Sequence, residues 1–144
     1  MKYKIFIDKT REEEILIYAH KKTKMIDEIE NIILSEGVEI TAYKNNETFK
    51  LSPLEICCFS AEDNRVFAFT MKDKLQIKQR LYQLDEILNE NFIKINKSCI
   101  INIKCIKKFD ASLSGNLCVT LENGFKDYVS RRNLKSVKER LGVR

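Results

Sequence analysis

A chain of 144 residues is long enough to bury one hydrophobic core, since domains usually span about 100 to 150 residues. Its 44% hydrophobic residues, with only four Gly and one Pro, are typical of a folded protein and exclude a disordered chain. The net charge of +5 is modest, but residues 91–144 carry twelve Lys and Arg against four Asp and Glu, a local charge of +8 that favours an acidic partner such as nucleic acid.

The chain begins with two segments that predict short strands. Residues 2–7 alternate with a period of two, and residues 14–18 form a second short apolar run. Charged side chains interrupt the first of them, so it cannot supply the apolar core of a signal peptide. No segment approaches the roughly 18 apolar residues that a membrane-spanning helix needs. We therefore expect a cytoplasmic protein.

The clearest helix is predicted over residues 24–36. Thr23 can cap its first turn and Gly37 can end it. Apolar side chains recur at helical spacing, at Met25, Ile29, Ile32 and Ile33. Such a stripe either packs onto the rest of the protein or mediates self-association, and the pattern alone favours neither.

From Val38 onward the pattern becomes that of short strands. Turn-forming clusters at residues 44–46 and 62–64 separate some of them. The strands are expected at residues 38–43, 47–51, 55–61, 65–71 and 74–78. Leucines and isoleucines at helical spacing then predict a short helix over residues 81–88.

The last third of the chain predicts further strands and a closing helix. Strand-like runs cover residues 92–95 and 98–109, and a hairpin follows whose Asn123-Gly124 pair favours a tight turn with positive φ. The final helix has Ser130 as its expected cap and Gly142 just beyond it. About ten strands and three short helices together indicate a mainly β fold.

Side chains suited to metal binding or catalysis are scarce. The five cysteines are an odd number, lie in apolar runs and form no C-x-x-C or Cys/His pairing, so we expect buried, reduced thiols and no metal site. They are Cys57, Cys58, Cys99, Cys105 and Cys118. The single histidine, His20, has no catalytic motif around it, and there is no Gly-rich phosphate loop. The sequence therefore predicts a protein that is not an enzyme and has no cofactor and no small-molecule substrate.

Two arginines follow the expected cap of the last helix. Arg131 and Arg132 would lie at the positive end of the helix dipole, where their charge is mildly unfavourable. A nearby phosphate would reverse that effect, because helix N-termini and arginine side chains both bind anions, and Arg is also the commonest bidentate partner of guanine. The alternative is a salt bridge to Asp127 or Glu122, or a solvated surface pair.

Lysines interrupt the apolar run that begins at Phe92. In an alternating strand, Lys94 shares a face with Phe92, while Lys97 and Ser98 fall at the strand's end, where a loop could present them. The alternative is an edge strand that lysines protect against aggregation.

These segments together resemble the LytTR DNA-binding domain of bacterial transcriptional regulators. The resemblance covers about residues 40–144 and implies small β-sheets packed in layers, with loops rather than a recognition helix entering successive major grooves of bent DNA. It rests on FSAEDNRVFAF (59–69), FIKINKSCIIN (92–102), IKKF (106–109), LENG (121–124) and VSRRNLKSVK (129–138).

The resemblance also implies which residues contact DNA. The positions that match the family's base-reading places lie in two loops and at the start of the last helix, at Asn64, Arg65, Lys97 and Arg132. Those that match supporting or phosphate-contacting places are Lys94, Ser98, Asn102 and Arg131. The family often has Arg or His where this chain has Lys94, Asn96 and Lys97, so its base preference is not carried over.

The resemblance divides the chain into two parts. Residues 1–39 form a β-β-α extension that is a candidate dimerisation element, and residues 40–144 form the LytTR-like domain. The extension is too short for the receiver domain of a response regulator. The chain therefore looks like the small stand-alone LytTR regulators, some of which are restrained by a membrane protein.

The resulting hypothesis is a cytoplasmic, dimeric transcription regulator that binds paired direct repeats in double-stranded DNA. A membrane-protein regulator would be a second partner. The alternative is a protein-interaction module whose basic C-terminal face docks a membrane partner or an anionic surface. RNA binding is disfavoured, because no basic strand rich in aromatic residues is present.

Overall fold

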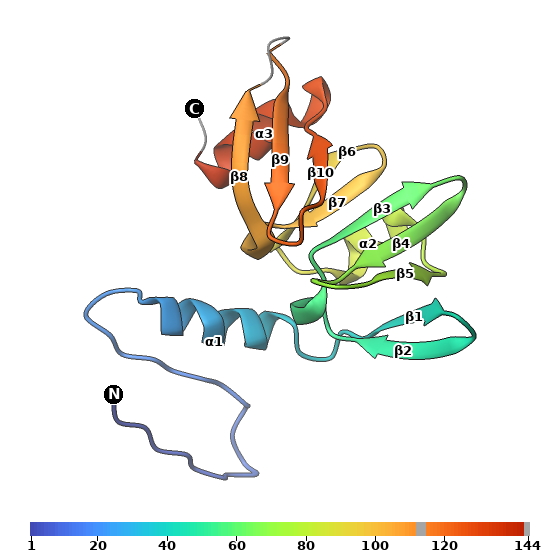
Figure 1. The fold of residues 1–144 in the computed structure, drawn as a ribbon. Helices are drawn as coiled ribbons and strands as arrows, with labels where there is room; N and C mark the ends of the chain where they lie inside the picture. The colour runs from blue at the N-terminus through green and yellow to red at the C-terminus, as the bar shows by residue number, and fades with distance from the viewer. Residues whose placement is uncertain (112–114, 143–144) are drawn as a thin grey trace.

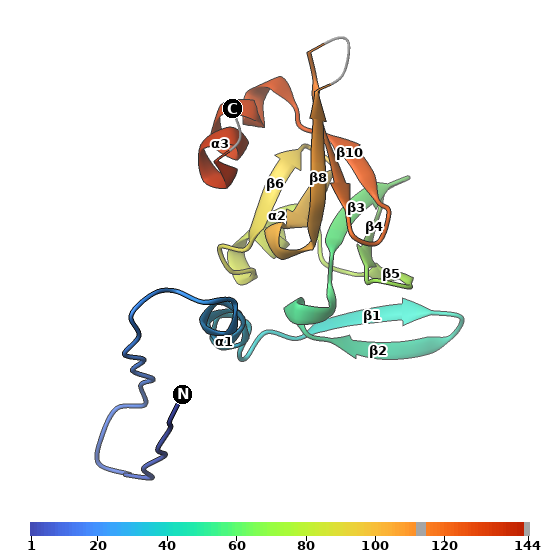
Figure 2. The same ribbon diagram turned by 60° about the vertical axis from the view of Figure 1, so that its left-hand side comes forward.

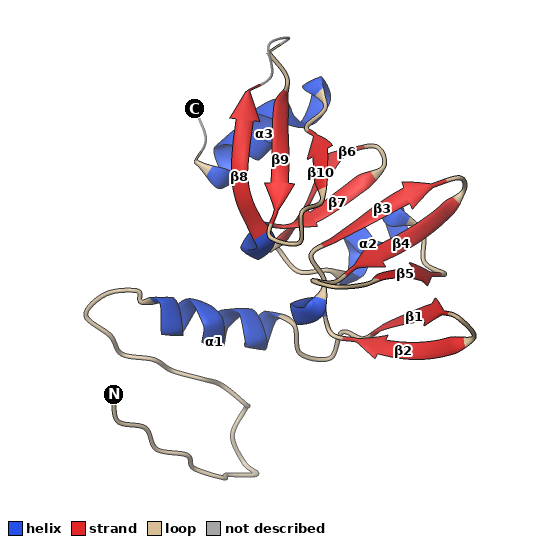
Figure 3. Cartoon of the chain, viewed as in Figure 1, coloured by secondary structure: helices blue, strands red, loops and turns tan. Residues whose placement is uncertain are grey.

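The computed structural model describes residues 1–111 and 115–142 (Figure 1). Figure 3 shows that strands predominate, as the sequence predicted. The strands are β1 (Ile40–Lys44), β2 (Glu47–Leu51), β3 (Cys58–Glu62), β4 (Arg65–Phe69), β5 (Lys74–Ile77), β6 (Phe92–Asn96), β7 (Cys99–Asn102), β8 (Ile106–Ala111), β9 (Leu117–Leu121) and β10 (Lys126–Tyr128). The helices are α1 (Lys24–Leu34), α2 (Leu81–Ile87) and α3 (Arg131–Leu141), with short 3₁₀ turns at Pro53–Glu55 and Ile103–Cys105.

The described strands form two antiparallel sheets. The larger has the order β2-β1-β5-β4-β3-β7-β6, and the smaller has the order β10-β9-β8. Tight turns join neighbouring strands where the chain carries Asn or Asp. Asp63 and Asn64 have φ of 49° and 63°, the left-handed conformation that a two-residue hairpin turn needs and that Asn and Asp tolerate. Local turn residues thus fix the register of β3 against β4.

Strand β3 lies between two hydrophobic cores. Phe59 is buried in one core with residues of β1, β4, β5 and α2, whereas the preceding residue, Cys58, is buried in the other with residues of β9 and α3. Strand β7 is divided in the same way, with Ile100 in the first core and Ile101 in the second. Both strands are covered on both faces, which explains why their sequences are almost continuously apolar.

The strand-like run at residues 98–109 is divided between the two sheets. It forms β7, a 3₁₀ turn at Ile103–Cys105 and then β8, which leaves the larger sheet and pairs with β9. Apolar periodicity alone cannot reveal this change of sheet, because apolar residues suited to a strand occur both before and after the 3₁₀ turn.

The two strands predicted at residues 2–7 and 14–18 do not form, which corrects the β-β part of the expected extension. Residues 1–22 are exposed and make no strand pairing with any described residue. A strand requires a partner for its backbone, and neither segment finds one among residues 1–111 and 115–142. Figure 2 shows this segment extending away from the sheets.

The predicted helix forms as α1, which ends at Leu34, two residues earlier than expected. The Ile26 amide donates a hydrogen bond of 3.4 Å to the Thr23 hydroxyl, so Thr23 is the cap that the sequence predicted. Gly37 has φ of 76° and lies just beyond the helix. Of α1 itself, no residue is buried, although it is strongly amphipathic.

Candidate nucleic-acid interface

Three segments that carry predicted contact residues lie along one edge of the molecule. They are the β3–β4 turn at residues 62–65, the β6–β7 turn at residues 96–98 and the start of α3 at residues 130–132, and we call them together the binding edge. In Figure 1 the β3–β4 turn lies at the right, the β6–β7 turn lies above it, and α3 begins near the top. Residues far apart in sequence are therefore brought together here.

Hydrogen bonds attach the first turn to the second. The Ala61 amide in β3 donates to the Ser98 carbonyl at 2.8 Å, next to the Ser60–Cys99 pair of the β3–β7 ladder. Within the second turn, the Ser98 amide donates to Asn96 Oδ1 at 2.8 Å. The backbone that presents Lys97 and Ser98 is thus held against β3.

Two more hydrogen bonds attach the second turn to the start of α3. Asn96 Nδ2 donates to the Tyr128 carbonyl at 2.8 Å, and the Ser130 amide donates to the Ile95 carbonyl at 2.8 Å. Val137, which is 2% exposed, anchors α3 in the second core. Because all these contacts form within one chain, the three segments are fixed relative to one another before any ligand binds.

The cations of the binding edge point into solvent. Arg65, Lys97, Arg131 and Arg132 are exposed, and among the described residues no acidic side chain forms an ion pair with any of them. The salt bridge from Arg131 or Arg132 to Asp127 or Glu122 is therefore not formed. These charges remain available to an anionic ligand.

The start of α3 is arranged as the sequence predicted, with one difference. Ser130 occupies the N-cap position, but its side chain makes no capping hydrogen bond. Gly142 ends the helix in the left-handed conformation, with φ of 67°. Arg131 and Arg132 thus add positive charge at the positive end of a helix whose first turn lacks a side-chain acceptor, which is a suitable environment for phosphate.

Asn64 and Lys94 occupy different parts of this region. Asn64 is exposed at the tip of the β3–β4 turn. Lys94 is exposed on β6, which is the last strand of the larger sheet, so its position agrees both with a DNA-contacting lysine and with a lysine that protects an edge strand.

Asn102 does not belong to the binding edge. It is 3% exposed and is the last residue of β7, whereas the β6–β7 turn precedes the first residue of that strand. Its Nδ2 donates to the Ile56 carbonyl at 3.0 Å, and its Oδ1 accepts from the Lys104 amide at 3.0 Å. The side chain is fully engaged in holding the corner after β7, so we assign it a structural position and leave it out of the proposed interface.

Arg80 is a supporting residue that the sequence did not reveal. Its Nη1 donates to the Asn64 carbonyl at 3.0 Å and so attaches the β3–β4 turn to the segment before α2. The two residues are 16 positions apart and share no motif, so the contact between them is visible only in the folded structure.

All five cysteines are free thiols, and they differ in burial. Cys57, Cys58 and Cys99 are buried, and burial raises the pKa of Cys58 and Cys99. Cys105 and Cys118 are half-buried, which differs from the expectation that all five would be buried. In the described ranges, no group of three or more His, Cys, Asp or Glu side chains could hold a metal ion. None of the described helices is long and apolar enough to cross a membrane.

Comparisons with known proteins find similar sequences and a similar fold. The profile of the LytTr DNA-binding domain matches residues 46–142. Two relatives, both named as uncharacterized HTH-type transcriptional regulators of Staphylococcus aureus, are 32% and 33% identical over 146 residues, with 99% of each chain covered. A solved structure from Bacillus cereus, described as the LytTr DNA-binding domain of a putative methyl-accepting/DNA response regulator, matches with a TM-score of 0.68. It covers 72% of this chain and 96% of its own at 18% identity, which shows a shared fold.

Proposed function

This chain belongs to the LytTR family of DNA-binding domains, and we propose that it regulates transcription by inserting the binding edge into the major groove of paired direct-repeat promoter sites. The family makes it a DNA-binding regulator and not an enzyme. The observation that carries the finer proposal is the binding edge itself, where three adjoining segments present unpaired cations on a fixed backbone.

Base contacts are proposed for the residues at the tips of the three segments. Arg65 and Arg132 carry the guanidinium group that best matches the two acceptors of guanine, and Asn64 carries the amide that matches adenine. Lys97, at the tip of the β6–β7 turn, adds a donor between them. Because the tips belong to three segments side by side, they would contact successive positions along the groove.

Phosphate contacts are proposed for the residues that flank these tips. Ser98 and Arg131 each lie beside a tip residue, Lys94 lies on β6 three positions before Lys97, and all three are at least partly exposed. Each phosphate that a cation neutralises releases counterions, so the logarithm of affinity falls with the logarithm of salt concentration by roughly 0.9 for each contact. These residues should strengthen binding to every sequence alike.

We also propose that the protein acts as a homodimer, since paired sites require two binding edges. A membrane-protein regulator and a cytoplasmic location belong to the same proposal, which follows from the small stand-alone LytTR regulators that the sequence resembles. The alternative function is docking of the basic C-terminal face onto an anionic surface, which the unpaired arginines would equally permit.

A selection experiment separates these functions. DNA bound by the purified chain would be selected from a random pool, and the winning duplex, a scrambled duplex and vesicles rich in phosphatidylglycerol would be titrated at several salt concentrations. We expect a recurring paired motif and much tighter binding to the winning duplex than to the scrambled one. Equal binding to both duplexes, or stronger retention by the vesicles, would contradict sequence-specific recognition.

A further inference from the structure

Large apolar side chains are exposed on the first part of the chain. We call residues 1–18 the arm, and its aromatic and aliphatic side chains contact little of the rest of the protein. Their exposed fractions are high, with Tyr3 84%, Ile5 76%, Phe6 82%, Ile7 88%, Ile15 64%, Leu16 65%, Ile17 40% and Tyr18 91%. Soluble monomers rarely expose so many large apolar residues in one segment, and such a surface marks an interaction site.

The second half of the arm and α1 together form an apolar groove. It has a volume of about 230 Å³ and is lined almost entirely by isoleucine and leucine side chains. The lining residues are Ile15, Ile17, Ile26, Ile29, Glu30, Ile33 and Leu34. One face of residues 14–18 is therefore already turned towards α1, and the groove between them lacks a covering layer.

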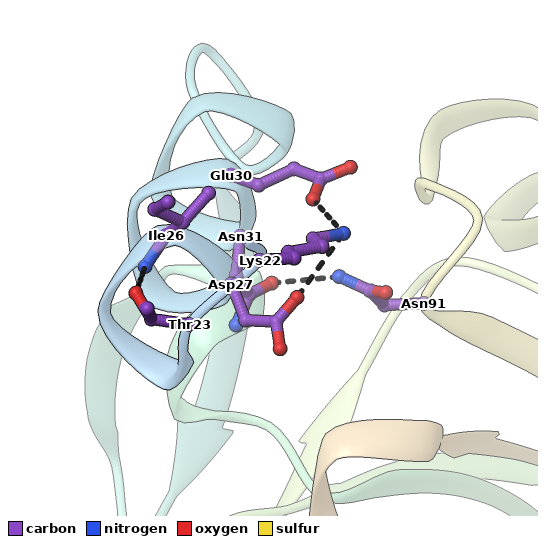
Figure 4. A network of polar contacts seen from close by, with 7 residues as sticks. All are labelled: Lys22, Thr23, Ile26, Asp27, Glu30, Asn31 and Asn91. Carbon is purple, nitrogen blue, oxygen red and sulfur yellow. Dashed lines mark hydrogen bonds and ion pairs between the residues drawn. The ribbon is translucent and has the colours of Figure 1, made fainter. Parts of the chain in front are cut away.

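Polar contacts hold α1 so that this groove faces away from the sheets. Figure 4 shows that Lys22 pairs with Asp27 at 3.1 Å and with Glu30 at 2.6 Å, beside a hydrogen bond of 2.8 Å from Asn91 Nδ2 to Asn31 Oδ1. The side of α1 that meets the rest of the protein is thus polar, and three of its isoleucines, Ile26, Ile29 and Ile33, lie on the side of the arm.

The two halves of the arm are complementary when they are written in parallel. Residues 2–7 read KYKIFI and residues 12–17 read EEEILI. With an offset of ten positions, Lys2 and Lys4 stand opposite Glu12 and Glu14, and the three apolar residues at positions 5–7 stand opposite those at positions 15–17. Both lysines then meet a glutamate, the three apolar residues meet apolar ones, and Tyr3 stands opposite Glu13.

One chain cannot form this parallel pairing with itself. Only residues 8–11 connect the two segments, whereas parallel neighbours need a connection of a dozen or more residues. The antiparallel hairpin that so short a connection does allow would place the apolar residues 5–7 opposite the glutamates, and the lysines opposite apolar residues. This mismatch explains why the arm of one chain remains unpaired, with only a local turn in which Thr10 donates to Asp8 Oδ1.

We propose that two copies of this chain dimerise by exchanging their arms, residues 2–7 of each copy pairing in parallel with residues 12–17 of the other. The backbone groups of both segments gain hydrogen-bond partners. Ile5 and Ile7 lie on the same face as Ile15 and Ile17 of the other copy, so they extend the apolar layer over the groove. Packing against α1 supplies the support that a two-stranded ribbon lacks by itself.

This inference rests on the homodimer of the proposed function and specifies how it forms. Reversing charges tests it directly, in full-length protein and without DNA. One variant carries Lys2→Glu and Lys4→Glu, and the other carries Glu12→Lys and Glu14→Lys. Each reversal places like charges at four positions of the dimer, so each variant alone should dissociate with a constant about tenfold higher or more than the wild type, measured by sedimentation.

Mixing the two variants in equal amounts should restore the dimer. In the mixed dimer, the acidic residues 2–7 of the first variant pair with the basic residues 12–17 of the second. The basic residues 2–7 of the second variant likewise pair with the acidic residues 12–17 of the first. A hairpin within one chain cannot be rescued by mixing. Lys72→Glu, an exposed reversal far along the chain, should leave the dimer unchanged.

Three outcomes would overturn the exchange: a wild-type monomer at micromolar concentration, variants that dimerise as well as the wild type, or variants that mixing fails to rescue. Binding to a single half-site would be measured in parallel. If it persists while the dimer results fail, the arm exchange is wrong and DNA recognition stands. If the dimer results hold and no duplex is preferred, the proposed function is wrong instead.

Discussion

The binding edge and the arm leave opposite kinds of group without a partner within the chain. At the binding edge, the backbone is tied by hydrogen bonds and the unpaired groups are cations on its surface. In the arm, large apolar side chains are exposed alongside the lysines and glutamates, and the backbone of residues 2–7 and 12–17 forms no strand pairing with any described residue. The difference indicates different ligands, since free cations suit phosphate and base edges, whereas an unpaired apolar strand suits another strand.

The two regions also differ in what binding must order. The binding edge is already fixed, so contact with DNA immobilises little more than side chains. The arm has to become a strand as it binds, and the loss of backbone entropy offsets part of the gain from apolar burial. We therefore expect the arm to contribute through linking two binding edges rather than through contact with DNA.

Deleting residues 1–18 removes the arm and leaves the binding edge intact, and this change should have the largest effect on DNA affinity. Two linked binding edges bind a paired site more tightly because the second contact is intramolecular, an advantage of about 10² to 10⁴-fold. The truncated chain should lose that advantage while its affinity for one half-site stays the same. Titration of paired and single half-sites measures both quantities. An unchanged affinity for the paired site would show that the arm does not link the two copies.

The thermal stability of the truncated chain provides the control. No residue of the arm is buried in either core, so its removal should leave the melting temperature within a few degrees of that of the full chain. A large decrease would mean that the arm stabilises the sheets directly.

Asn102→Ala should affect the fold and leave recognition intact. Truncating this buried side chain leaves the Lys104 amide without a partner and the Ile56 carbonyl with only the weak donor Cys105 Sγ at 4.0 Å, which we expect to cost about 2 to 4 kcal/mol in the free energy of unfolding. Chemical denaturation measures this loss, and Gln76→Ala, at an exposed strand position, should change the same free energy by less than about 0.5 kcal/mol. If the variant instead remained stable and lost sequence preference, Asn102 would contact DNA after all.

Comparing Arg132→Ala with Lys107→Ala distinguishes a base contact from a phosphate contact. Arg132→Ala should lose about 1 to 3 kcal/mol of discrimination between the selected and scrambled duplexes, because its bidentate bonds to a base are removed. Lys107 is exposed on β8, away from the tips, so Lys107→Ala should at most weaken all sequences alike and reduce the salt slope by about one. Titrations of both duplexes at several salt concentrations give these numbers, after melting curves confirm that both variants are folded.

The cysteines should have the smallest effect. Burial raises the pKa of Cys58 and Cys99, and because the thiolate is the reactive form, both should react slowly with thiol reagents at pH 8. None of the five cysteines lies in the binding edge, so we expect a mild oxidant, like a chelator, to leave DNA affinity unchanged. Mass spectrometry would quantify the modified thiols in the same samples that are titrated with DNA. A large loss of DNA affinity that accompanies thiol modification would contradict this prediction.

Local sequence signals were sufficient to predict much of the body of the protein. The β3–β4 hairpin follows from the Asp63-Asn64 turn, α1 follows from its Thr23 cap, and the end of α3 follows from Gly142. Each of these features is decided by residues a few positions apart. The clustering of cations after residue 90 likewise indicates an acidic ligand from the amino-acid sequence alone.

Features that depend on distant residues could not be predicted in this way. Strand periodicity at residues 2–7 gave no sign that the segment lacks a partner within its own chain. The family motif placed Asn102 among the contact residues, yet its side chain is buried and donates to the carbonyl of Ile56, which is 46 positions away. The hydrogen bond from Arg80 to Asn64 depends in the same way on how β3 and β4 lie beside the start of α2.

The measurement that tests the central claim most directly is the base preference of three single variants, Arg65→Ala, Lys97→Ala and Arg132→Ala. Each would be titrated against the selected half-site and every single-base change of it. If the three segments of the binding edge enter the groove side by side, each variant should lose preference at its own position, and the three positions should follow one another along the DNA in the order of the segments. A uniform weakening that leaves all base preferences intact would contradict the account, because the binding edge would then contact only the phosphate backbone.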